Sequence, residues 1–283
     1  MNWKLFSYIP LVYLLACGAT ETGPQTPEDS PRVIQLERFR KALWKVPLTV
    51  RDTTVDFLFD TGGGITLLTK ELSEKIDCHF WGRTTGYNMF GMRGDGPHCD
   101  SVQLYAGDVP LVPVNVGTIN FADRFPGDKA PDGLLSLDAF DNRAVTLDQQ
   151  AGELIIETPA SLAARTQHMT EFPLRVSREC SGRCLSIFLG VATPAGMTWL
   201  LLDSAAGGVS LFSKEYASVF GLDPEVKEQH LRFTLSEDII VDSPALVTDM
   251  IMDGNLGQPF MSQHVITIDI LNSRIWLAPN APS

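Results

Sequence analysis

Two apolar runs in this chain end on an aspartate. One run, VDFLFD, ends at Asp60, and the other, TWLLLD, ends at Asp203. Each is preceded by a further apolar run and a turn-forming segment, which predicts a pair of β-strands leading into each aspartate. After each aspartate and a few small residues, apolar side chains recur every four positions, as is typical of a short helix. The same order of elements therefore occurs twice.

Self-similarity along the sequence indicates an internal duplication. The segment DGLLSLDAFDNRAVTLDQQAGELII, from Asp132, lies without a gap over DGNLGQPFMSQHVITIDILNSRIWL, from Asp253. The segments VDFLFDTGGGITLLTKEL and TWLLLDSAAGGVSLFSKEY also match, with one extra residue in the second. Since both copies are rich in strand patterns with short connections, we expect a mostly-β protein of two compact sheets or barrels, each with short helices.

The duplication also predicts the domain boundaries. We expect a first lobe over residues 32–165 and a second lobe over residues 166–283. The segment that follows the helix of the first copy is about twenty residues longer than its counterpart and contains the glycine-rich stretch TTGYNMFGMRGDGPHCD. This stretch predicts a mobile hairpin on the first lobe only, with Gly91 and Gly94 near its tip.

The N-terminus has the pattern of an export signal. A short apolar run follows one early lysine, is too short to cross a bilayer comfortably and ends in LLACG. It resembles the bacterial lipobox, which implies a signal peptide over residues 1–16 and lipidation of Cys17. The protein would then be anchored in the bacterial cell envelope, facing the periplasm or the exterior, and Gly18 favours the outer membrane. The polar residues 17–31 predict a flexible tether. The alternatives are an ordinary signal peptide and a buried apolar segment with a chance cysteine.

The other four cysteines fit an oxidising compartment. Cys78 and Cys99 flank one segment, while Cys180 and Cys184 form a tight C-x-x-x-C, so the simplest disulfide pairing is within each pair. A zinc site is the alternative, but the five histidines are scattered without the spacing of ligand pairs. We therefore expect no metal and no cofactor.

Charge and composition limit the possible partners. The formal net charge is −12 and no Lys/Arg cluster reverses it locally, which argues against binding to a nucleic-acid backbone. The hydrophobic content of 44% is ordinary for a globular protein.

The two aspartates carry the strongest chemical signal. A single Asp-Thr-Gly after a strand is equally consistent with a turn. Its recurrence favours a function, because a carboxylate at the end of an apolar strand is costly to bury without one. Two carboxyl groups brought together by a pseudo-two-fold axis share one proton and can activate a water for amide hydrolysis. Thr61 and Ser204 would hold the two loops, and Gly62 would allow close approach of the backbone.

These motifs resemble those of the retropepsin-like and pepsin-like aspartic proteases. LFDTGGG and LLDSAAGG are each followed by a helix, and later by GLLS or GNLG ahead of VTLD or ITID; the resemblance covers residues 33–278. It implies two retropepsin-like β-barrel lobes related by pseudo-two-fold symmetry, with a peptide cleft between them. Asp60 and Asp203 would be the catalytic residues, the first-lobe hairpin would be a flap over the cleft, and Tyr87 would be its aromatic residue.

The chain departs from the family pattern in three places. The third motif position, a glycine in the family, is Ala205 in the second copy, which also carries the extra loop residue. Ser136 replaces a later glycine in the first copy, and Gly63 stands where the family prefers serine or alanine. Because the Cβ of Ala205 could displace Asp203 from the dyad, these departures bear on activity rather than on fold.

Two functions fit this pattern. The first is a monomeric, membrane-tethered aspartic endopeptidase that hydrolyses a peptide or protein substrate with a water activated by the aspartate dyad. The alternative is a catalytically inactive lipoprotein that keeps the fold as a peptide-binding or envelope scaffold, and Ala205 and Ser136 support it. The first is favoured, and the sequence holds no G-x-S-x-G, H-E-x-x-H or G-K-[ST] motif for another hydrolase.

Overall fold

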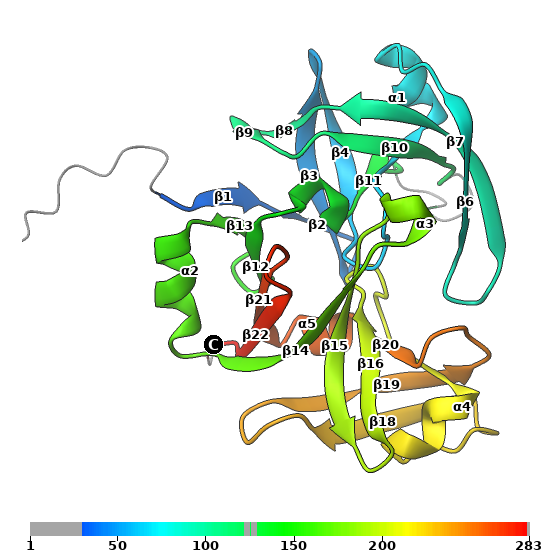
Figure 1. The fold of residues 1–283 in the computed structure, drawn as a ribbon, viewed down its shortest axis with the longest axis vertical. Coiled ribbons are helices and arrows are strands. Elements are labelled where there is room, and N and C mark those ends of the chain that lie inside the picture. The colour runs from blue at the N-terminus through cyan, green and yellow to red at the C-terminus, as the bar shows by residue number, and fades with distance from the viewer. Residues whose placement is uncertain (1–29, 122–124, 126–128, 282–283) are drawn as a thin grey trace, which may run out of the picture.

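The computed structural model describes residues 30–121, 125 and 129–281. Figure 1 shows most strands of the first copy in the upper part of the molecule and most strands of the second copy in the lower part. The predicted signal peptide, Cys17 and nearly all of the predicted tether lie outside the described residues, so these remain predictions.

Most strands of the first copy form one sheet of ten strands. Its order is β6-β7-β10-β5-β11-β4-β3-β8-β9, and β2 pairs with β3. The strands are β2 (Glu37–Phe39), β3 (Leu43–Val50), β4 (Thr53–Phe59), β5 (Leu67–Thr69), β6 (Trp81–Tyr87), β7 (Arg93–Val102), β8 (Leu104–Ala106), β9 (Val109–Pro110), β10 (Val114–Ile119) and β11 (Gly133–Leu135).

The second sheet has twelve strands and takes members from both copies. Its order is β1-β13-β12-β21-β22-β14-β15-β16-β20-β17-β19-β18. The strands are β1 (Arg32–Gln35), β12 (Ala144–Asp148), β13 (Glu153–Glu157), β14 (Thr170–Ser177), β15 (Ser186–Thr193), β16 (Gly196–Leu202), β17 (Ser210–Ser213), β18 (Glu228–Thr234), β19 (Ile240–Thr248), β20 (Gly254–Leu256), β21 (His264–Asp269) and β22 (Arg274–Pro279). The mostly-β prediction is confirmed. Within the described residues neither strand order closes on itself, so closed barrels are not shown.

The helices are short. They are α1 (Lys70–Lys75), α2 (Pro159–Thr166), α3 (Glu179–Gly182), α4 (Lys214–Ala217), α5 (Gln258–Met261) and two 3₁₀ turns, Leu137–Phe140 and Ser218–Phe220. The helix after each aspartate is shorter than the apolar spacing predicted, because Leu68 and Phe212 lie in strands. Thr69 and Ser213 cap α1 and α4 through their hydroxyls. No helix in the described ranges is both long and apolar enough to cross a membrane.

The two copies repeat one pattern of strand pairing. In each, a short strand lies parallel to the strand that leads into the aspartate and antiparallel to the strand that follows the aspartate loop: β11 between β4 and β5, and β20 between β16 and β17. Where the copies meet, β12 and β21 pair antiparallel with Thr146 opposite its equivalent, Thr267. Their buried hydroxyl oxygens are 2.8 Å apart. Antiparallel pairing of equivalent residues is what a local two-fold axis between the copies produces.

The apolar strands ahead of the aspartates lie in the core. Phe57, Phe59, Leu200 and Leu202 are all buried, as their unbroken apolar sequence predicts. A Cβ on Gly133 would lie 2.4 Å from Cε1 of Phe57, so glycine is what lets β11 lie against β4. Each aspartate therefore follows a strand that is fixed by packing.

Both predicted disulfides are present, Cys78–Cys99 and Cys180–Cys184. The first joins the segment after α1 to β7, and the second closes a short turn ahead of β15. The pairing expected from cysteine spacing is confirmed.

Candidate functional site

The loops that follow β4 and β16 hold each other through reciprocal hydrogen bonds. The amide of Thr61 donates to Ser204 Oγ at 3.0 Å, and the amide of Ser204 donates to Thr61 Oγ1 at 3.0 Å. The Thr61 hydroxyl donates to the carbonyl of Leu202 at 2.7 Å, and the Ser204 hydroxyl donates to that of Phe59 at 3.2 Å. Thr61 and Ser204 are both fully buried. The two copies are thus joined directly beside the aspartates.

Asp60 and Asp203 both lie close to Gly62. The amide of Gly62 donates to Asp60 Oδ1 at 2.8 Å, while a Cβ on Gly62 would lie 2.8 Å from Asp203 Cγ. A Cβ on Gly63 would lie 2.7 Å from Leu134 Cδ2 and 3.1 Å from Asp60 Oδ2. Both carboxyl groups are buried, at 8% and 6% exposure. The structure therefore brings the two predicted aspartates together, and the small residues between them make that approach possible.

Three fixed donors hold the carboxylate of Asp203. The amides of Ala205 and Ala206 each donate to Oδ1 at 3.0 Å, and the side-chain amide of Asn255 donates to Oδ2 at 2.9 Å. Burial raises the pKa of Asp203, and these three hydrogen bonds oppose the rise because they favour the ionised form. Both carboxyl oxygens of Asp203 are therefore bound to groups of the protein itself.

Asn255 is the site residue that the sequence reasoning missed. It is fully buried in β20, and its Oδ1 accepts the amide of Leu211 at 2.7 Å, which fixes the direction of its donor. The equivalent position in the first copy is Leu134, which cannot donate a hydrogen bond. The signal was present in the two aligned motifs, GLL and GNL, as a polar residue at an apolar position.

Ala205 does not remove Asp203 from the pair. Its amide still donates to Asp203, and the extra residue of this loop is accommodated where Ala206 O accepts the amide of Gln258 at 2.9 Å. The expected displacement of Asp203 by the Cβ of Ala205 is therefore absent in this loop. The amide of Ala206 is a third donor to Asp203, which the comparison of motifs did not reveal.

Ser136 lies beside the loop of Asp60, next to another buried carboxyl group, that of Asp138. The amide of Ser136 donates to Thr66 Oγ1 at 3.2 Å, and the Thr66 hydroxyl donates to Asp138 Oδ1 at 2.6 Å. The amide of Thr66 donates to Asp138 Oδ2 at 2.9 Å. Burial raises the pKa of Asp138 to about 6, although the hydrogen bonds from Thr66 oppose it. Asp138 thus fixes the start of β5.

The stability contributed at Asp138 should depend on pH. Because the folded-state pKa is raised, the folded protein holds a proton that the unfolded chain releases, so stability should fall as pH rises from about 4 to above about 6, by about 3 kcal/mol. In Asp138→Asn, which mimics the protonated acid, this loss should disappear. Urea unfolding of both proteins across that pH range measures the difference. An equal pH dependence in the two proteins would show that Asp138 does not titrate as stated.

The flap, defined as the β6–β7 hairpin, is attached to the second copy at its tip. The amide of Ile251 donates to the carbonyl of Met89 at 2.9 Å, and a Cβ on Gly91, whose φ is +74°, would lie 2.9 Å from Ile251 Cγ2. Gly91 thus has the tip position expected of it, while Gly94 lies within β7. The Tyr87 side chain is 62% exposed at the end of β6. It is not buried over the aspartates.

The Cys180–Cys184 turn connects the flap to the first aspartate loop. Arg183 donates to Thr84 of the flap at 3.1 Å, and a Cβ on Gly86 would lie 3.2 Å from the sulfur of Cys180. Directly after the turn, the amide of Leu185 donates to the carbonyl of Gly64 at 2.6 Å. The turn, the flap and the loop of Asp60 are therefore held together.

Residues 30–121, 125 and 129–281 contain no group of three or more His, Cys, Asp or Glu side chains arranged to hold a metal ion. The site is built from carboxyl groups, hydroxyls and backbone amides.

Two solved structures of other proteins resemble this one. The crystal structure of conglutin gamma, a basic 7S globulin from lupine seeds, matches with a TM-score of 0.54 and 11% identity, over 89% of this chain and 95% of that chain. The basic 7S globulin from soybean matches with a TM-score of 0.56 and 10% identity, over the same shares. This chain has the globulins' fold. No family model and no curated protein matches the sequence.

These neighbours correct the functional prediction. Both are described as plant globulins, and neither is described as a peptidase or as a bacterial lipoprotein. The assignment to the aspartic proteases in a bacterial lipoprotein form was therefore wrong, and so were the membrane-tethered endopeptidase function and the enzyme class.

Proposed function

We propose that this protein is a non-catalytic, two-lobed binding protein that holds a peptide segment of a partner without hydrolysing it. In this proposal the aspartates join the two copies instead of activating water. The fold shared with two globulins supports it, and so do the contacts around Asp203.

The hydrogen bond from Asn255 to Asp203 carries the proposal. Water activation needs a carboxyl oxygen that can take a proton from the water in the reaction. Here Oδ1 of Asp203 accepts two backbone amides and Oδ2 accepts the Asn255 amide. Hydrogen bonds to a charged group contribute about 1.5–3 kcal/mol each, so these donors favour the ionised form of Asp203 and oppose the rise in its pKa that burial causes. Leu134, the equivalent of Asn255 in the first copy, has no side-chain donor. The two aspartates are therefore held by different groups.

The attached flap supports a holding role. Bonds at the tip, through Met89 and Ile251, and at the side, through Thr84 and Arg183, fix the hairpin against the second copy. A fixed hairpin loses less conformational entropy when a ligand binds, which favours affinity. Catalytic turnover, in contrast, commonly depends on a hairpin that opens and closes over the substrate.

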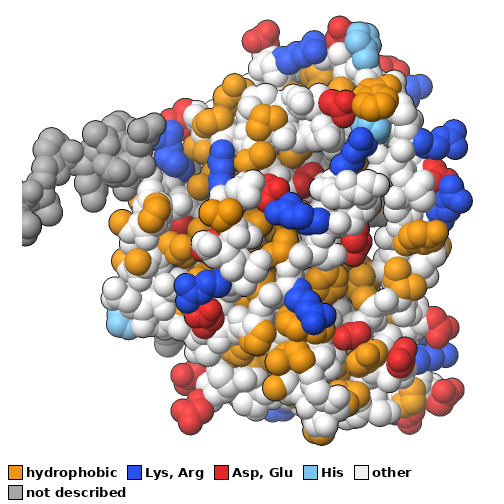
Figure 2. Space-filling model, viewed as in Figure 1, with side chains coloured by type: hydrophobic (Ala, Val, Ile, Leu, Met, Phe, Trp, Pro, Cys, Tyr) orange, Lys and Arg blue, Asp and Glu red, His pale blue; other side chains and the backbone are white. Residues whose placement is uncertain are grey.

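The same proposal includes two pseudo-symmetric lobes and a secreted or envelope location. The repeated strand pairing and the Thr146–Thr267 contact support the symmetry. Two disulfides support an oxidising compartment. Figure 2 shows acidic and basic side chains interspersed over the viewed face, which suits a protein partner better than a polyanion.

Selection from a random peptide display library tests this function. Selected peptides should bind the folded protein saturably by fluorescence anisotropy, with micromolar affinity, or about −8 kcal/mol, and mass spectrometry should recover them intact. The matched control is the same protein unfolded in denaturant. Failure of every selected peptide to prefer the folded protein, or recovery of cleaved peptides, would contradict the proposal.

A further inference from the structure

Three neighbouring strands of each copy carry different side chains at equivalent positions. They are β2, β3 and β4 in the first copy and β14, β15 and β16 in the second. Leu58 and Leu201 are equivalent, since each lies two residues before its aspartate. Strand pairing then defines the equivalent neighbours, which are Leu58–Lys45–Glu37 in the first copy and Leu201–Phe188–Arg175 in the second. By the same registers, Trp199 corresponds to Asp56 and Ser177 corresponds to Phe39.

In the first copy these strands hold two ion pairs of Lys45, and an apolar cluster lies beside them. Lys45 Nζ lies 2.8 Å from Asp56 and 3.9 Å from Glu37. Beside these ions a small apolar cluster forms, made of Phe39, Leu58, Phe121, Phe125 and Leu134. Phe125 is the centre of its aromatic contacts, with ring centroids 5.1 Å from Phe39 and 5.3 Å from Phe121. The segment between β10 and β11 supplies two of these three rings.

In the second copy the place beside Ser177 is open, while Leu201 and Asn255, the equivalents of Leu58 and Leu134, are buried. The connection between β19 and β20 is residues 249–253, against residues 120–132 in the first copy, so the ring-bearing segment has no counterpart. Ser177 stands where Phe39 fills the first copy. A pocket of about 610 Å³ lies here, within the size range of ligand sites, and neither Asp60 nor Asp203 lines it.

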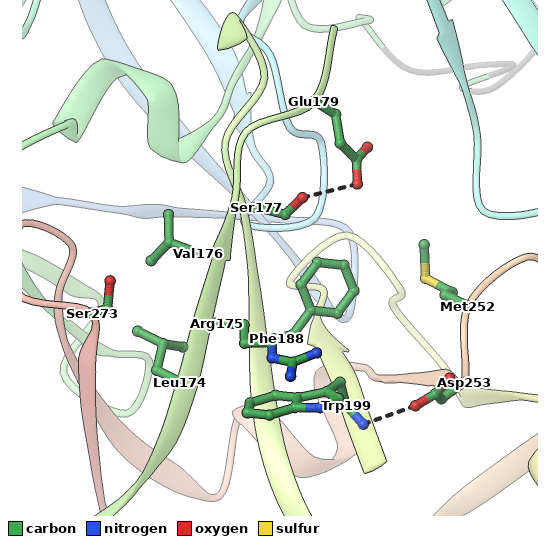
Figure 3. A pocket seen from close by; sticks show the side chains of 10 residues that line it. All are labelled: Leu174, Arg175, Val176, Ser177, Glu179, Phe188, Trp199, Met252, Asp253 and Ser273. Carbon is green, nitrogen blue, oxygen red and sulfur yellow. Dashed lines mark hydrogen bonds between the residues drawn. The ribbon is translucent and has the colours of Figure 1, made fainter. Parts of the chain in front are cut away.

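The pocket wall is aromatic and cationic. Figure 3 shows the Arg175 side chain over the Trp199 ring, with Phe188 on its other side in this view; the Arg175 Cζ lies 4.1 Å from the ring centroid. Three ionic positions of the first copy have thus become one arginine and two aromatic rings. Met252 adds a polarisable side chain to the wall, of the kind that packs well on aromatic rings.

We propose that this pocket binds an aromatic side chain of the partner peptide, beside the place that corresponds to the rings of Phe121 and Phe125 in the first copy. The inference deepens the proposed peptide-binding function and rests on it. The ring would pack on Phe188 beside Arg175, whose guanidinium is stacked on Trp199. A guanidinium also lies against an aromatic ring in the first copy, where Arg40 Cζ is 5.1 Å from the Phe125 centroid.

Charge at the rim selects what flanks the aromatic residue. The carboxylates of Glu179 and Asp253 both line the pocket, while its one guanidinium is already stacked on Trp199. A cationic residue next to the aromatic one therefore complements the rim. The chain's own segment INFADRFPGDKA, residues 119–130, has this combination in Arg-Phe and serves as the probe.

Titration of the nitrogen-15-labelled protein with this synthetic peptide tests the pocket. The indole N–H signal of Trp199, assigned with Trp199→Phe, should shift saturably. Ser177→Phe puts into the pocket the side chain that the first copy has at that position, and it should weaken binding at least tenfold. Ser218→Phe, the same change at an exposed serine outside the pocket, is the matched control and should bind as the wild type does. A peptide with both phenylalanines changed to alanine should lose binding.

A second variant keeps the test decisive if Ser177→Phe does not fold. Phe188→Lys installs the first copy's residue on the pocket wall and should also weaken binding at least tenfold. Absence of binding to the wild type, equal binding by the filled variant, or equal binding of the alanine peptide would each overturn the pocket assignment. If library-selected peptides still bind Ser177→Phe at full affinity, the pocket assignment fails and the proposed function stands. If no library peptide binds the wild type, the proposed function itself fails.

Discussion

Gly257→Ala should lower the free energy of unfolding by about 3 kcal/mol or more, the range of severe overpacking. A Cβ on Gly257 would lie 2.3 Å from the carbonyl oxygen of Val209 and 2.6 Å from that of Ala206. Both atoms belong to the backbone of the loop that holds Asp203, and side-chain rotation cannot relieve the overlap. The loop would have to move, and the hydrogen bond from Gln258 to Ala206 would be strained or lost.

The matched control is Gly208→Ala in the same loop, where a Cβ would meet nothing within 4 Å. Guanidinium unfolding followed by circular dichroism should show a large decrease in the midpoint for the first variant and little change for the second. Equal midpoints would mean that the loop does not pack on Gly257 as described. Ser136 stands at the equivalent position of the first copy, whose loop is one residue shorter.

Thr61→Val should lower the free energy of unfolding by about 2–6 kcal/mol. Valine has nearly the same shape as threonine, so packing is kept, but the amide of Ser204 and the carbonyl of Leu202 both lose their partner at a buried site. Each unsatisfied buried group costs about 1–3 kcal/mol. The lost hydrogen bonds are ones that join the first copy to the second.

Thr54→Val on the exposed end of β4 is the control, since its hydroxyl only contacts that of Thr49. Denaturant unfolding should destabilise Thr61→Val far more than the control. If the contact holds the two copies together, the unfolding of Thr61→Val should also lose cooperativity and separate into two steps. A Thr61→Val protein as stable and as cooperative as the control would rule out a structural role for these hydrogen bonds.

Features repeated within the sequence could be predicted. The strands, both aspartate loops and the hydroxyl partners Thr61 and Ser204 each carry a local signal that occurs twice, so the duplication raises weak motifs above chance. The disulfides followed from spacing and compartment, since only two close pairs were possible without a long crossing.

Features that depend on strand register could not be predicted. Arg175, Phe188 and Trp199 lie on three different strands and meet only because of their pairing. The attachment of the flap to Ile251 likewise joins a hairpin of one copy to a loop of the other.

The wrong functional prediction has the same physical origin. The aspartate motif records where a carboxyl group lies, but not which donors reach it from elsewhere in the fold. Asn255 lies in β20, whereas Asp203 follows β16, and the side-chain amide of Asn255 donates to one of the carboxyl oxygens of Asp203. The aspartate motifs therefore predicted that Asp60 and Asp203 come together, but not which groups donate hydrogen bonds to them.

The most direct test of the account is whether peptide bonds are broken. The protein is incubated with a mixed peptide digest in heavy-oxygen water from acid to neutral pH, and new carboxyl termini are counted by mass spectrometry. The control is the double variant Asp60→Asn/Asp203→Asn, compared at matched folded concentration. We predict no more labelled termini with the wild type than with the double variant. Labelled termini that appear with the wild type and vanish in the double variant would contradict a non-catalytic aspartate pair.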